Sequence, residues 1–245
     1  MARDELSEAL STLAGARGHV YALLSQGFYT PDEELAAGLW KGEFFLEVLR
    51  GLHGSRAPLC TAAIWTLADN KDIPTASALA EALRLEYARL FIGPYMLPCP
   101  PYESVYREPA WGVMGETTLE VRRAYKAAGF AIDPGVRELP DHVAIELEFL
   151  AGLGEEEAKA WAADDEPTGL CWLEHEHTFL ERHLGVWLPV FTNRMLGATT
   201  LPFYRSLACI AQAYVTHARE QVRALVHTLS GAAMVRAPAR STKSA

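Results

Sequence analysis

Residues 204–229 read YRSLACIAQAYVTHAREQVRALVHTL, and this stretch decides the fold class. Its apolar residues recur at intervals of three and four: Tyr204, Leu207, Ala211, Val215, Ala218, Val222, Leu225 and Leu229. That spacing places them on one face of an α-helix about seven turns long. A helix of this length with one apolar face is expected to pack against other helices.

The same helical spacing occurs over 6–28 and again over 79–90. Shorter helical segments, bordered by Pro or Gly, are expected at 31–39, 43–52, 58–68, 116–128, 141–153, 171–183 and 185–195. No segment alternates convincingly as a β-strand would. The sequence therefore predicts an all-α, bundle-like domain of about ten helices, with a central hinge loop.

The expected hinge lies within residues 129–140, where Asp133, Pro134 and Gly135 have the composition of a turn. It divides the chain into an N-terminal helical part with a proline loop (1–132), a hinge (133–139), a C-terminal helical part (140–230) and a disordered tail (231–245). A monomer and a domain-swapped dimer are both compatible with such a hinge.

Composition limits the partners and the compartment. A formal charge of -9 and a pI near 5.4 disfavour nucleic acid and anionic membranes, and favour a cationic peptide. No secretory signal and no apolar run of ~18 residues is seen, so we expect a cytoplasmic protein without stable membrane insertion. Neither a zinc site nor a disulfide framework is suggested, because the four cysteines are far apart: Cys60, Cys99, Cys171 and Cys209.

A proline-rich loop follows the helix that carries Phe91. Residues 94–106 read PYMLPCPPYESVY. Gly93 and Pro94 should end the helix near Ile92, and the further prolines make an ordered, non-helical loop. Its tyrosines and methionine would give an adaptable contact surface. The alternative is a stiff connector whose tyrosines pack on the helices.

The segment from Glu138 to Leu150 predicts another helix, with Pro140 at its first position and Asp141 in its first turn. On the functional interpretation, Glu138, Asp141 and His142 lie at the mouth of the hinge and offer negative charge beside apolar surface. Paired arginines followed by an apolar stretch would bind there. The alternative is a capped helix with an exposed ion pair.

A metal site is the main enzymatic alternative. Residues 174–177 read EHEH and contain one Glu-x-x-His step, a unit that di-metal helical bundles use twice. The second unit is missing, so a helical metalloenzyme using Glu146, Glu174 and His177 is the weaker hypothesis. No phosphate-binding loop, nucleophile elbow or H-E-x-x-H motif occurs. We therefore expect no catalytic residue, no cofactor and no metal.

Taken together, the two segments resemble the TorD/DmsD/NarJ family of maturation chaperones for molybdenum-containing oxidoreductases. The matching pieces are Glu86-Tyr87, Arg89-Leu90-Phe91, Gly93-Pro94, residues 100–106 (PPYESVY), Pro140-Asp141-His142 and residues 146–150 (ELEFL). The likeness extends from the first helix to about Leu229. A further run, Gly112 to Glu116, is similar to the branch that serves dimethyl sulfide, ethylbenzene, selenate or chlorate enzymes, with the nitrate reductase type left open.

This resemblance implies a non-catalytic chaperone that binds the twin-arginine signal peptide, or another segment, of a molybdopterin oxidoreductase catalytic subunit. It implies that the chaperone assists cofactor insertion and prevents premature export. Carried over by position, the peptide-binding residues are Phe91, Gly93, Pro94, Tyr102, Glu103, Glu138, Pro140, Asp141 and His142. Leu139, where some relatives have proline, and the absence of tryptophan near Gly93 depart from the family pattern.

Overall fold

The chain folds into helices over the part that the structure describes. This computed structural model describes residues 2–58, 73–93, 96–108 and 115–236. Those residues form ten α-helices and one π-helical turn, with one isolated β-bridge and no strand. The all-α prediction is confirmed. The helix expected at 58–68 lies outside the described residues, apart from Pro58.

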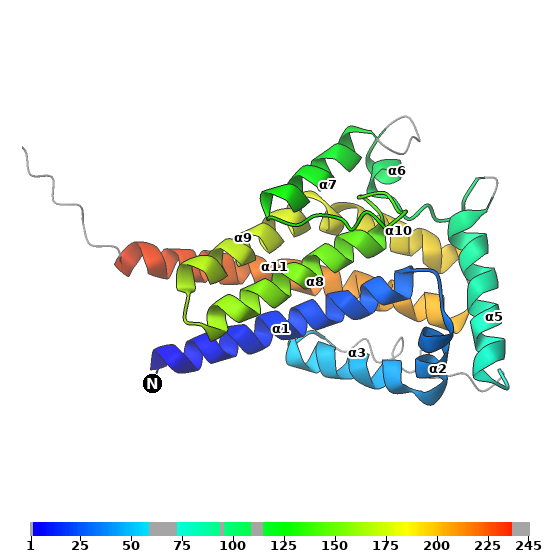
Figure 1. Ribbon diagram of the computed structural model, residues 1–245, viewed down its shortest axis with the longest axis horizontal. Coiled ribbons are helices and arrows are strands. Elements are labelled where there is room, and N and C mark those ends of the chain that lie inside the picture. Colours follow the sequence, from blue (N-terminus) through cyan, green and yellow to red (C-terminus); the bar gives the residue numbers. More distant parts are fainter. Residues whose placement is uncertain (1, 59–72, 94–95, 109–114, 237–245) are drawn as a thin grey trace, which may run out of the picture.

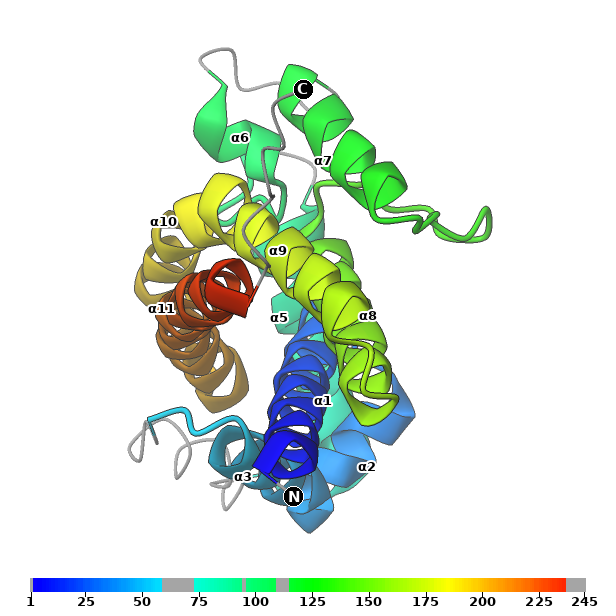
Figure 2. The same cartoon turned by 90° about the vertical axis from the view of Figure 1, so that its left-hand side faces the viewer.

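Five helices form the centre of the molecule (Figure 1). They are α1 (Ala2–Phe28), α8 (Val143–Ala162), α9 (Glu166–Arg182), α10 (Leu184–Ala198) and α11 (Pro202–Arg236). Figure 2, which looks nearly along them, shows α8 between α1 and α9, with α11 on the far side of α9. The helix that was expected from residues 204–229 thus packs inside a bundle.

Helices α1 and α8 run antiparallel and approach each other closely. Ser25 donates a hydrogen bond to the carbonyl oxygen of Ala144 at 2.8 Å, and Ser11 donates to that of Ala158 at 2.9 Å. Between these points, a Cβ atom on Gly154 would lie 2.9 Å from the Cα of Gly18. Only glycine leaves room for backbones this close, so two glycines set the distance between the helices.

The smaller helices cover the ends and one side of the bundle. At one end lie α2 (Glu33–Lys41), α3 (Glu43–Gly54) and α5 (Ala76–Tyr87), which continues into the π-helical turn η1 (Ala88–Ile92). On the side away from α2 and α3 lie α6 (Glu103–Arg107) and α7 (Glu116–Ala127). The predicted helix end near Ile92 is confirmed.

Three helix starts differ from the sequence prediction because side chains cap the helices elsewhere. Asp32 accepts a hydrogen bond from the Leu35 N–H, so α2 begins after Pro31. Asp165 caps α9, which therefore begins before Cys171. Most importantly, α8 begins at Val143 with His142 as its N-cap. The placement of Pro140 and Asp141 in its first turn was wrong.

Residues from both sides of the expected hinge share one hydrophobic core. The Tyr204 hydroxyl donates to the Leu83 carbonyl oxygen at 3.1 Å, and the Tyr214 hydroxyl donates to that of Arg17 at 3.2 Å. The division of the chain into two helical parts joined by a hinge at 133–139 therefore stays a prediction. Helix α11 continues to Arg236, beyond residue 231 where the tail was expected to begin, and 237–245 lie outside the described residues.

Candidate functional site

The structure brings the two segments singled out in the sequence side by side. The Glu103 N–H donates to the Asp141 carbonyl oxygen at 2.9 Å, and the Val143 N–H donates to the Pro101 carbonyl oxygen at 2.9 Å. These bonds flank the β-bridge between Tyr102 and His142. The proline loop is thus held by its backbone against the start of α8. We call this contact the crossing, comprising residues 101–104 and 140–143.

Asp141 is buried and bonds the backbone of the opposite segment. Its Oδ2 accepts a hydrogen bond from the Ser104 N–H at 3.0 Å, at the start of α6. A carboxylate there satisfies an N–H that the helix leaves unpaired and meets the positive end of its dipole. Asp141 therefore joins the two segments of the crossing in this structure and is not part of an exposed acidic surface.

His142 is equally enclosed, at 1% exposure. Its Nδ1 accepts a hydrogen bond from the Ala144 N–H at 3.2 Å, which caps α8. The rings of Tyr29 and Tyr102 pack against it, with centroids 6.3 and 5.3 Å away. Burial lowers the pKa of His142 to about 4, so the ring is neutral at physiological pH.

Below the crossing lies a buried acidic cluster. The Glu103 carboxylate is 3.1 Å from Nδ1 of His183 and 2.5 Å from Nη1 of Arg107. Glu146 is also buried, and its Oε2 accepts from the Trp187 indole N–H at 3.1 Å. Burial, and then the charge of Glu103, hold the pKa of Glu146 well above its usual range. Glu146 is therefore held as a neutral acid.

The accessible part of the crossing consists of tyrosines and carboxylates. The half-buried Tyr102 donates its hydroxyl hydrogen bond to Glu138 at 2.9 Å. Tyr29, which the sequence analysis did not identify, donates to exposed Glu148 at 2.7 Å. Burial and Glu148 raise the pKa of Tyr29, so its hydroxyl stays protonated and can donate. One exposed carboxylate, Glu148, and one partly exposed carboxylate, Glu138, thus border the crossing.

The nine predicted binding residues therefore fall into three groups. Phe91 joins the core, where its ring lies 5.0 Å from that of Tyr87, and the other buried members are Glu103, Asp141 and His142. The partly exposed members are Gly93, Tyr102, Glu138 and Pro140. Pro94 lies outside the described residues. Asp141 and His142 were expected to offer their side chains at the mouth of the hinge. In this structure both side chains are buried and accept hydrogen bonds from backbone N–H groups.

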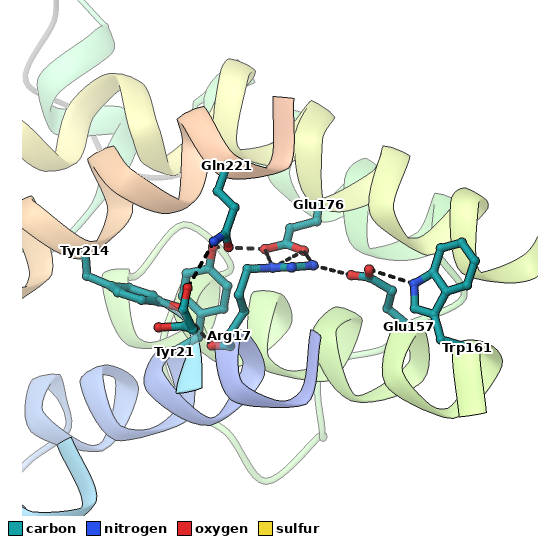
Figure 3. A network of polar contacts seen from close by, with 8 residues as sticks. Arg17, Tyr21, Glu157, Trp161, Glu176, Tyr214 and Gln221 are labelled. Atoms are coloured by element: carbon teal, nitrogen blue, oxygen red, sulfur yellow. Dashed lines mark hydrogen bonds and ion pairs between the residues drawn. The ribbon is translucent and has the colours of Figure 1, made fainter. Parts of the chain in front are cut away.

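A second polar network, within the bundle, was missed (Figure 3). Nη2 of Arg17 lies 2.5 Å from Glu157 and 3.0 Å from Glu176, and all three side chains are almost fully buried. The Tyr21 hydroxyl donates to Glu176 at 3.0 Å, and the Trp161 indole N–H donates to Glu157 at 2.9 Å. Burial, opposed by Arg17 and assisted by Glu176, raises the pKa of Glu157 to about 7. This network joins α1, α8 and α9.

The EHEH run has a structural role rather than that of a metal site. Its buried member, Glu176, belongs to the Arg17 network, whereas Glu174 is exposed. Glu146 lies in the acidic cluster. Among the described residues, no three His, Cys, Asp or Glu side chains are grouped closely enough to hold a metal ion. The metalloenzyme alternative is not supported.

The chain is similar to a known family of proteins. Residues 53–193, more than half of the chain, match the model of the family described as nitrate reductase delta subunit. The chain belongs to this family. Relatives named TorD and DmsD place it with the TorD/DmsD/NarJ chaperones, as the sequence resemblance suggested.

Among relatives of this TorD/DmsD/NarJ member, the perchlorate reductase assembly chaperone protein of Dechloromonas aromatica is 27% identical over 82% of this chain and 87% of its own length. The Tat proofreading chaperone DmsD of Salmonella typhi is 31% identical over 54% of this chain and 58% of its own. A solved structure of a putative redox enzyme maturation protein from Archaeoglobus fulgidus has 24% identity and a TM-score of 0.47, covering 84% of this chain and 93% of that one.

These names describe chaperones and maturation proteins rather than catalytic enzymes. Within the described residues, no helix is both long enough and apolar enough to cross a membrane.

Proposed function

We propose that the protein is a cytoplasmic chaperone for the catalytic subunit of a molybdopterin oxidoreductase. It binds the subunit's twin-arginine signal peptide, or another segment, while the cofactor is inserted, and so prevents premature export. Family membership carries this proposal, because the matched region includes both the proline loop and the crossing. The relatives' names supply the class of client.

The crossing supports recognition of paired arginines. Exposed Glu148 and partly exposed Glu138 both lie near Tyr29, and tyrosine hydroxyl groups hold both carboxylates in place. A guanidinium group pairs well with a carboxylate whose orientation is already fixed. Asp141, His142, Glu103 and Phe91 then support this surface from behind without touching the peptide.

A client of the oxyanion reductase type is the finer proposal. The perchlorate reductase assembly chaperone aligns with 82% of the chain, whereas the DmsD match covers 54%. The run from Gly112 to Glu116, which resembles the branch serving dimethyl sulfide, ethylbenzene, selenate or chlorate enzymes, lies mostly outside the described residues.

Co-purification from the native host tests the proposed function. A tagged chain should enrich one large molybdopterin subunit, identified by mass spectrometry, and should enrich it less when the subunit's signal peptide is deleted. Glu138→Gln should weaken capture, whereas Glu220→Gln, which changes an exposed carboxylate on α11, should not. Asp141→Ala and His142→Ala are poorer tests, because both side chains bond backbone N–H groups. Failure to enrich any molybdopterin subunit would overturn the proposal.

A further inference from the structure

A long cavity of about 800 Å³ lies beside the α1–α8 pair. The two helices form its floor, and residues 130–136, which include part of the expected hinge, form one wall. None of the nine predicted binding residues lines it. It is therefore a separate surface from the crossing.

The lining of the cavity is largely apolar. Small residues line the middle of the floor, with Gly15 and Ala22 on α1 and Ala151 and Ala158 on α8. The larger Ile145 and Phe149 of α8 also line the cavity, and so do the polar side chains of His19, Glu155 and Lys159. Phe130 adds an aromatic wall, with its ring packed against Gly152. A largely apolar groove with an aromatic wall suits a chain of apolar side chains.

The length of the cavity limits what it can hold. Its lining on α8 extends from Ile145 to Ala162, which corresponds to roughly 25 Å at the rise of an α-helix. That length accommodates about 16 residues of helix or about 8 residues of extended chain. The apolar segment of a signal peptide, at roughly 7–15 residues, falls in this range.

The charges around the cavity are unequal at its two ends. Glu148 lies near the end where α8 begins, and Asp133 lies on the loop wall. Among the described residues neither pairs with a cationic side chain, since Glu148 bonds Tyr29 and Asp133 bonds the Gly135 N–H. Toward the other end Lys159 is neutralised by Glu155 at 2.8 Å.

The acidic end of the cavity meets the crossing, because Tyr29 contacts Glu148 on one side and the His142 ring on the other. We propose that the cavity is the docking groove for the apolar segment of the client's signal peptide, whose preceding arginines lie at Glu148 and Glu138. This inference rests on the proposed function and gives the peptide a direction. The arginines lie at the start of α8, and the apolar segment extends toward Ala162.

A second copy of the chain is a poorer occupant than this peptide. The chain carries a net charge of -9, and two copies joined at this surface would bring the carboxylates at Glu148 and Asp133 together. A peptide with basic residues at one end and apolar residues after them complements both the charge and the surface.

Binding of a synthetic peptide tests the groove. The probe is a fluorescent peptide with two adjacent arginines followed by about 14 leucine and alanine residues, and a second probe lacks the apolar part. Ala22→Trp places a large ring in the groove from an exposed position on α1. The matched control is Ala224→Trp, at an exposed position on α11 that does not line the cavity.

Ala22→Trp should weaken binding of the long probe by about tenfold or more, whereas Ala224→Trp should leave it unchanged. The short probe should bind both variants and the unchanged protein equally. Glu148→Gln should weaken both probes. Circular dichroism and the unfolding midpoint should be unchanged for each variant, which separates loss of binding from loss of fold.

Three outcomes would overturn the groove assignment. If Ala22→Trp binds the long probe normally while Glu138→Gln still weakens capture of the client, the groove is wrong and the proposed function stands. If Ala22→Trp instead disrupts a dimer of the unchanged protein, the groove holds a second copy. If the unchanged protein captures no signal-bearing subunit, the proposed function fails together with the groove.

Discussion

Replacing Arg17 with methionine should destabilise the protein strongly, because it leaves two carboxylates buried without their cation. Glu157 and Glu176 have side-chain exposures of 1% and 0%, and one guanidinium lies between them. Removing one partner from such a buried group costs roughly 3–5 kcal/mol. We expect a loss of that size in the free energy of unfolding at pH 8, measured by urea denaturation.

The loss should depend on pH in a defined direction. Burial already raises the pKa of Glu157 to about 7 from its ordinary value of 4.5, and removal of Arg17 raises it further. Between the unfolded and folded pKa values the folded state binds more protons, so stability falls as pH rises through this window. The destabilisation by Arg17→Met should therefore be smaller at pH 5 than at pH 8.

Two further variants make the test specific. The triple variant Arg17→Met, Glu157→Gln, Glu176→Gln contains no buried charge at this site and should recover most of the lost stability. Arg50→Met, which breaks an exposed pair with Glu47, should cost under about 0.5 kcal/mol. The reasoning is refuted if Arg17→Met costs less than about 1 kcal/mol at pH 8, or if the triple variant is no more stable than the single one.

Three other predictions concern the crossing and the α1–α8 contact. The neutral His142 ring, with a pKa of about 4 when folded and 6.5 when unfolded, should make the protein about 2 kcal/mol less stable at pH 5 than at pH 8. His142→Gln should abolish that part of the dependence in urea titrations, and an unchanged pH profile would contradict the assignment. Glu146→Gln should be nearly neutral because Glu146 is protonated, whereas Glu103→Gln should lower the free energy of unfolding by about 2 kcal/mol. Equal losses from the two would contradict this. Gly154→Val should cost about 1–3 kcal/mol or more because its Cβ would meet Gly18, and a melting temperature equal to that of the unchanged protein would count against the close approach.

The helices were predictable from the sequence because each has an apolar face of regular spacing. The start of α8 was not, since Pro140 and Asp141 have the composition of a first helical turn. Their backbone instead belongs to the crossing, where Val143 bonds Pro101. Pairing across this separation leaves no local signal, and a histidine N-cap is not among the preferred capping residues.

The Arg17 network could have been suspected but not located. Arg17 continues the apolar stripe formed by Leu10 and Leu13 before it and Val20 and Leu24 after it, so a charge occupies a core position. The stripe does not show which carboxylate pairs with Arg17. Glu176 is 159 residues away in sequence and lies within a run that looked like a metal-binding unit.

The antiparallel contact between α1 and α8 also determines when the protein can work during its own synthesis. The N-terminal helix leaves the ribosome first, yet its partners are α8 and, through Tyr214, α11. Until those segments emerge, α3 is the main described helix that packs against α1. The surface between α1 and α8, where we propose that the client's signal peptide docks, therefore forms late in translation.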